Sequence, residues 1–260
     1  MDTNLWLVTL IFRKRFKGAT ILQIGDTMLI LNKLVEENKA EEILEYAREF
    51  HGHVCPYVAL GIRTSLIAMN ELSVGRLDYS ASVNESILAI VEINSCFTDG
   101  VQVTTGCTLG NNSLIYMDLG KTALTLVKRS TWEGVRVYID AEKLEKYYPP
   151  EARELFNKVI KERKGSPEER EYLKELWEDI ARTMLYLPRE EFKIEQVKIP
   201  PIEQAPIFES IRCSECGELA MSRRIVYINE EPLCYKCAGK EYHAVIGRGI
   251  VKIGGSGNGA

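Results

Sequence analysis

The chain has 260 residues, with 33 Lys and Arg against 37 Asp and Glu. The resulting net charge of -4 provides no electrostatic basis for nucleic acid binding, so we do not expect a nucleic acid partner. The composition, 45% hydrophobic and 27% charged, is that of a globular protein with room for one sizeable core and a smaller module. An apolar run of about 20 residues is missing, so we expect no membrane span.

The first 28 residues are predicted to be an N-terminal tail or extension. They contain a short apolar stretch, residues 5–12, followed by a basic stretch, residues 13–17, and this is too short to cross a bilayer. The next segments, Ala40–Phe50 and Cys55–Leu72, are predicted helices. Pro56 favours the first helical position, so Cys55 is expected at the N-cap, where the helix terminus would lower the pKa of its thiol.

The middle of the chain mixes strands and helices without regular alternation. Its β-branched apolar runs predict strands and its charged stretches predict helices. We therefore predict an α+β domain with a mixed or antiparallel sheet and helices packed on it. The expected strands are 86–94, 114–117, 122–128, 135–139 and 192–199, and the expected helices are 97–104, 141–164 and 168–185.

The C-terminal part is predicted to be a separate zinc module. Two C-x2-C pairs separated by seventeen residues are a strong signal for four-thiolate zinc, held by Cys213, Cys216, Cys234 and Cys237. A hairpin around Asn229 and a helix over 238–243 would complete a treble-clef finger. The predicted organisation is a tail (1–28), an α+β metal-binding core (29–200), a linker (201–209), the finger (210–246) and a flexible tail (247–260).

The remaining cysteines form a second, less regular group with two histidines. Thiolate and imidazole are ligands that zinc and softer transition metals prefer, and an odd number of cysteines argues against a disulfide framework. We therefore predict a reducing, cytoplasmic location and a core metal, zinc by default, with nickel or iron as alternatives. The predicted ligands are His51, His53, Cys55, Cys96 and Cys107. A metal-free cysteine/histidine site and simple packing remain alternatives.

Three further residues complete the predicted site. Asp99 lies three residues after Cys96, on the same face if the segment is helical, and could orient a histidine, act as a base or bind the metal. Lys121 and Arg63 are cations suited to an anionic ligand. For an enzyme, the predicted catalytic residues are His51, His53, Asp99 and Lys121, and the open metal position would polarise a carbonyl or activate water.

The motifs resemble those of the FmdE family, named after the E-type subunit of formylmethanofuran dehydrogenase. They occur in the family's order as FHGHVCP (50–56), ALGIR (59–63), CFTDGVQ (96–102), TGCTLGN (105–111) and DLGKTA (118–123). The resemblance implies an α+β homodimer, associated with a molybdenum- or tungsten-dependent enzyme of one-carbon metabolism. Tyr57 departs from the family, where glycine is common.

Two functions follow from the sequence and the resemblance. In the first, an open His/Cys site binds or transforms a one-carbon ligand or one related to a molybdenum or tungsten cofactor. In the second, the protein is a non-catalytic accessory component: the core stores or senses metal, and the finger docks onto a partner oxidoreductase. The sequence does not decide whether the protein is an enzyme.

Overall fold

A computed structural model describes residues 30–255; the predicted tail at 1–28 and the last five residues lie outside this range. The core starts with a helical segment at residues 30–36. Its first half then contains α3 (Ala40–His51), α4 (Pro56–Leu72), α5 (Tyr79–Val83), β1 (Ile87–Val91), α6 (Cys96–Thr105), β2 (Leu114–Tyr116), β3 (Ala123–Lys128) and β4 (Glu133–Ile139).

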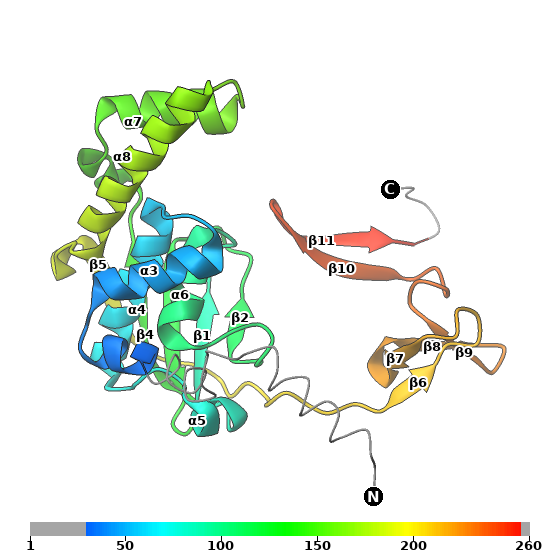
Figure 1. Cartoon of the computed structure of the whole chain (residues 1–260). Helices are drawn as coiled ribbons and strands as arrows, with labels where there is room; N and C mark the ends of the chain where they lie inside the picture. The colour runs from blue at the N-terminus through cyan, green and yellow to red at the C-terminus, as the bar shows by residue number, and fades with distance from the viewer. Residues whose placement is uncertain (1–29, 256–260) are drawn as a thin grey trace, which may run out of the picture.

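A helical arm separates β4 from the last strand of the core. The expected long helix over 141–164 is broken, because Pro149 and Pro150 interrupt it. A 3-10 helix precedes its α-helical part and a π-helical turn follows that part. The arm consists of a 3-10 helix (Glu142–Tyr147), α7 (Pro150–Leu155), a π-helical turn (Phe156–Lys161) and α8 (Pro167–Leu185), and a 3-10 turn (Arg189–Glu191) leads to β5 (Phe192–Lys198). In Figure 1 the arm projects beyond the sheet.

The five core strands form one mixed sheet in the order β2-β1-β3-β4-β5. The strands β1 and β2 are parallel because α6 connects them as a crossover, and the remaining pairs are antiparallel. The α+β prediction with a mixed sheet is therefore confirmed. Helices α3, α4 and α6 cover one face of this sheet (Figure 1), and its alternating residues Ile87, Ala89 and Val91 point into that helical layer.

Two glycines let α4 and α6 touch backbone to backbone. A Cβ added at Gly61 would lie 2.1 Å from the carbonyl oxygen of Phe97, and one added at Gly100 would lie 2.2 Å from that of Val58. Any larger residue would force the helices apart. Gly61 is the sixth residue of α4 and Gly100 the fifth of α6, so the contact also brings the two N-termini near each other.

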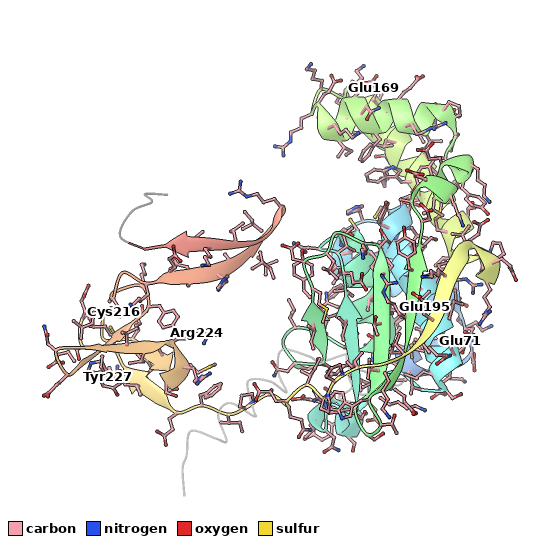
Figure 2. All side chains as sticks on the ribbon, turned by 180° about the vertical axis from the view of Figure 1, so that it is seen from behind. Glu71, Glu169, Glu195, Cys216, Arg224 and Tyr227 are labelled. Carbon is pink, nitrogen blue, oxygen red and sulfur yellow. The ribbon has the colours of Figure 1, made fainter. Side chains whose placement is uncertain are left out.

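The predicted linker is partly fixed to the core. Ile202, together with Ile199, packs on a small apolar cluster on the second face of the sheet. Arg129 donates a hydrogen bond to the carbonyl of Ile202, and the amide of Ala205 donates to Glu85 at 3.0 Å. The first half of residues 201–209 is therefore held in place, and only the second half bridges to the finger (Figure 2).

The C-terminal module consists of three two-stranded sheets. Its hairpin around Asn229 is confirmed, and Asn229 and Glu230 both take positive φ values, 51° and 69°, in the turn. The strands are β6 (Ser210–Arg212), β7 (Leu219–Met221), β8 (Ile225–Ile228), β9 (Glu231–Cys234), β10 (Glu241–Ile246) and β11 (Gly249–Gly254), with a 3-10 turn at Ser222–Arg224.

Two predictions for this module are wrong. The helix expected over 238–243 is not formed, because Gly239 takes a left-handed φ of 62° and the following residues pair as β10 with β11. Residues Gly249–Gly254 are consequently a strand and not part of a flexible tail. The β10–β11 hairpin also contacts the core: the amide of Ile250 donates to Asp118 at 2.8 Å, and Asn94 donates to the carbonyl of Ile246 at 3.2 Å.

No helix within residues 30–255 has the length and apolar character required to pass through a bilayer. The labelled finger residues Cys216, Arg224 and Tyr227 in Figure 2 lie apart from Glu71 and Glu195 of the core. The described chain therefore has two regions where chemistry can be sought, the core and the finger.

Candidate metal centre

Four of the five predicted core ligands converge. One ligand atom from each of His51, His53, Cys55 and Cys96 lies within 4.8 Å of the other three. Three chain segments supply them: the end of α3, the loop after it leading to the N-cap of α4, and the first residue of α6. Two imidazoles and two thiols at this spacing are a donor set typical of zinc.

The local sequence explains why these side chains meet. His51 ends α3, and Gly52 stops the helix in a left-handed conformation with a φ of 89°. The segment is thus a sharp turn, in which the ring centres of His51 and His53 lie 4.4 Å apart. Cys55 is the N-cap of α4, as predicted, and the Gly61–Gly100 contact brings Cys96 beside it.

Asp99 fixes the orientation of His51. Its carboxylate lies 2.6 Å from Nδ1 of His51 and also accepts a hydrogen bond from Gln102 at 2.9 Å. Nε2 of His51 is buried and has no hydrogen-bond partner among residues 30–255. A buried imidazole nitrogen without a partner is costly unless it binds something, and a metal ion would satisfy it. Of the three roles considered for Asp99, the geometry favours orienting the histidine, because both carboxylate oxygens are already engaged.

The thiols of Cys55 and Cys96 shift each other's pKa in opposite directions. The pKa of Cys96 is lowered to about 6, chiefly because the thiol of Cys55 donates a hydrogen bond to its sulfur. The pKa of Cys55 is raised, chiefly by the same hydrogen bond and then by burial. The prediction that the helix terminus would lower the pKa of the Cys55 thiol is therefore wrong: backbone amides at the start of α4 do favour its thiolate, but the neighbouring sulfur and burial outweigh them.

His53 is suited to bind a metal in its neutral form. Burial lowers the pKa of His53, and the nearby His51 lowers it further. The imidazole therefore keeps a free lone pair at neutral pH, as metal coordination requires. His53, Cys55 and Cys96 also line a cavity, so three of the four candidate ligands are next to open space.

Cys107 does not join this cluster. It follows Gly106, the C-cap of α6, and a ten-residue helix places it about 15 Å from Cys96 at the start of the same helix. Its side chain is fully buried in the apolar core, and burial raises the pKa of its thiol to about 12. The prediction of Cys107 as a ligand is corrected accordingly: its surroundings are those of a small core residue.

The two predicted cations also lie elsewhere. Arg63 donates twice to the carbonyl of Leu187, at 3.0 and 2.8 Å, and so anchors the end of the helical arm. Lys121 is exposed just before β3 and is not among the residues that line the cavity. The structure therefore provides no support for either residue at the metal cluster.

The cavity next to the cluster has a volume of about 560 Å³ and is the main feature that the sequence did not reveal. Its far wall belongs to the helical arm, which carries no recognised motif. The aromatic and charged residues of that wall are Glu145, Tyr148, Arg153, Phe156, Lys161 and Trp177. Their only signal in the sequence is a set of aromatic residues inside otherwise charged helices.

The finger has a separate and closed ligand set. The sulfurs of Cys213, Cys216, Cys234 and Cys237 all lie within 4.8 Å of one another. The backbone amide of Cys234 donates to the sulfur of Cys213 at 3.4 Å, and Gly217 takes the left-handed conformation that the turn after the first pair requires. Four thiolates fit a structural zinc ion, which would supply the folding energy that so small a module lacks.

Comparison with known proteins agrees with this division. Residues 50–193 match the family described as "FmdE, Molybdenum formylmethanofuran dehydrogenase operon", and residues 206–243 match the "Prokaryotic dksA/traR C4-type zinc finger". A crystal structure of a tungsten formylmethanofuran dehydrogenase FmdE-like protein from Syntrophus aciditrophicus is 29% identical, with a TM-score of 0.50, and the similarity covers 77% of this chain and 92% of that one.

A curated relative from Archaeoglobus fulgidus is 59% identical over 239 residues, which are 92% of this chain. It is described as a "Probable S-adenosyl-L-methionine-binding protein", and the chain spans 64% of its length. The matched core, the arrangement of its motifs and the solved relative lead to one assignment: the chain belongs to the FmdE family and carries a C-terminal C4-type zinc finger.

Proposed function

We propose that the core is a metal-dependent ligand-binding domain, in which His51, His53, Cys55 and Cys96 hold one transition metal, zinc by default, at the wall of the cavity. The observation that supports this most is the buried, unpartnered Nε2 of His51, because Asp99 has already fixed the other nitrogen of the same ring. Because the pKa of Cys96 is lowered, its thiol is present as a thiolate at neutral pH, which is the form that binds a metal ion.

Each residue has a definite task in this proposal. Asp99 keeps the Nδ1 proton of His51 in place, and His53 presents a neutral imidazole on the cavity side. A bound zinc ion would supply a Lewis acid at the cavity wall. The family resemblance suggests a one-carbon ligand or one related to a molybdenum or tungsten cofactor. The name of the archaeal relative adds S-adenosyl-L-methionine to the ligands worth testing, although about a third of that protein lies beyond the matched length.

The second function, a non-catalytic accessory component, is favoured by the number of ligands. Four protein ligands are typical of closed sites, whereas catalytic zinc sites commonly have three and a water. In this case the core stores or senses metal, and the finger docks onto a partner oxidoreductase. The exposed Leu219, Met221 and Tyr227 of the finger are available for such a contact. A homodimer remains part of both proposals.

Metal analysis of the full-length protein, purified without oxygen, tests the centre itself. The wild type should contain two metal ions per chain, and Cys96→Ser and His53→Ala should each contain one while the circular dichroism spectrum is unchanged. Cys107→Ala is the matched control and should keep two. One metal ion per chain in the wild type, removed by Cys213→Ser, would refute a core metal.

Cobalt substitution separates the two functions. Cobalt(II) in a mixed sulfur and nitrogen site gives visible absorption bands that respond to a further ligand. If the core metal is reachable from the cavity, azide should shift these bands in the wild type and have no effect on the finger signal that remains in Cys96→Ser. Bands that do not respond to azide would favour the closed, accessory role. Loss of partner binding on deletion of the finger would support docking.

A further inference from the structure

The helical arm places one cation at the cavity in an unusual way. Residues Phe156–Lys161 form a π-helical turn, in which residues five apart lie one above the other. In an α-helix the same two residues would point about 140° apart. The turn therefore puts Lys161 on the same side as Phe156: its ammonium lies 5.5 Å from the centre of that ring, and both residues line the cavity.

The charge of Lys161 is not neutralised within residues 30–255. The neighbouring lysines behave differently, because Lys158 pairs with Glu169 and Lys164 pairs with Glu162. The other two charged residues of the arm wall, Glu145 and Arg153, lie 3.5 Å apart and offset each other. The cavity therefore has one net positive charge on the arm side, which favours an anionic group in the ligand.

The remaining surface of this wall suits a flat ring. Trp177 of α8 lies between the metal cluster and the π-helical turn, with its ring centre 6.1 Å from that of His53 and 6.1 Å from that of Phe156. Tyr148 adds a third aromatic side chain to the lining. Aromatic faces bind planar rings through offset or edge contacts, and a volume of about 560 Å³ is in the range of small-molecule sites.

We infer that the cavity binds a small molecule with a planar aromatic or heteroaromatic ring and an acidic substituent, the ring lying against Trp177 and Phe156 and the acidic group pairing with Lys161. The inference rests on the proposed function, since it specifies the class of ligand that the core would hold beside its metal. The π-helical turn fits this inference, because an α-helical turn would point Lys161 away from Phe156.

Three probes separate the ring from the charge. They are 2-naphthoate, which has both, 2-naphthamide, which has the ring alone, and propionate, which has the acid alone. Binding to the full-length protein is measured by saturation-transfer NMR and calorimetric titration. We expect 2-naphthoate to bind about tenfold more tightly than 2-naphthamide, which corresponds to one modest ionic contact. Propionate should show no binding at the same concentration.

Variants then locate the acidic group. In Lys161→Gln the affinities for 2-naphthoate and 2-naphthamide should become about equal. The control Lys164→Gln changes a lysine outside the cavity and should keep the roughly tenfold preference for 2-naphthoate. Equal binding of the two naphthyl probes to the wild type, or no binding of either at about 1 mM, would overturn the inference. A preference that survives Lys161→Gln but disappears in His53→Ala would place the acid at the metal and also overturn it.

The metal content of each sample is measured in parallel. A wild-type core without metal that still shows Lys161-dependent binding of 2-naphthoate would refute the proposed function and leave the ligand class intact. A metal-loaded core that does not bind 2-naphthoate would refute the ligand class and leave the proposed metal site intact.

Discussion

The contact between Gly61 and Gly100 provides the sharpest test of how the core metal site is built. In Gly100→Ala the new Cβ would lie 2.2 Å from the carbonyl oxygen of Val58. An ordinary van der Waals contact starts at 3.4 Å, so α4 and α6 must separate by 3.4 − 2.2, or about 1.2 Å. Overpacking of this kind costs about 1–3 kcal/mol, and the higher helix propensity of Ala returns up to about 1 kcal/mol.

The effect on the metal should exceed the effect on stability. Cys55 and Cys96 stand at the starts of the two helices that move apart, and metal–ligand distances tolerate only about 0.2 Å. We expect Gly100→Ala to remain folded in urea titrations, with the free energy of unfolding lower by about 0–2 kcal/mol. Its core metal should be lost to a chelator at a concentration that leaves the finger zinc bound.

The finger serves as an internal reference in this assay, because its ligands lie on other elements. Gly75→Ala is the matched control: a Cβ there meets no atom of the described residues within 4 Å. It should keep both metals and wild-type stability. If Gly100→Ala holds its core metal as tightly as the wild type, the helix contact does not position the cysteines and the reasoning fails.

Three further predictions concern Asp99 and Cys107. Asp99→Asn should weaken core metal binding by about 10–100-fold, since the group that orients His51 loses its charge; chelator competition measures this, and an unchanged affinity would show that the contact is incidental. Cys107→Ala should retain both metals and lower the free energy of unfolding by about 1 kcal/mol. Loss of the core metal in this variant would show that Cys107 is a ligand after all. The same thiol predicts an effect of pH on stability. Burial raises the pKa of Cys107 from 9.0 to about 12, so the thiol loses its proton at a lower pH in the unfolded chain than in the folded one. The stability that the protonated thiol contributes is therefore complete below pH 9 and is lost as the pH rises toward 12. At pH 10.5 the wild type should therefore have lost about 2 kcal/mol more than Cys107→Ala, relative to pH 8, in urea unfolding, and parallel curves would contradict the assigned burial.

Local signals were sufficient for most of the core. Pro56 marks the start of α4 and places Cys55 at its cap, and the β-branched run of residues 87–91 gives the central strand. In each case residues close in sequence determine the outcome, so spacing alone is informative.

The failures arise where distant residues decide. Cys107 shares a motif-rich segment with Cys96, but the rigid length of α6 separates them, and spacing does not show the direction of a helix. Trp177 and Lys161 reach the cavity through the packing of the arm and a π-helical turn, neither of which has a sequence signature. Residues 241–246 form a strand because their partner, 249–254, follows them, whereas a helix over 238–243 was expected as the last element of a treble-clef finger.

The finger is attached to the core at both ends. Glu85 and Arg129 clasp the chain before it, and Asp118 receives the amide of Ile250 after it. A module anchored at two points samples a much smaller volume than a module on a single flexible linker, and this raises its effective concentration at the core. The two anchors therefore limit the positions that the finger can take relative to the core, and Asp118→Ala should widen that range without altering a single cysteine.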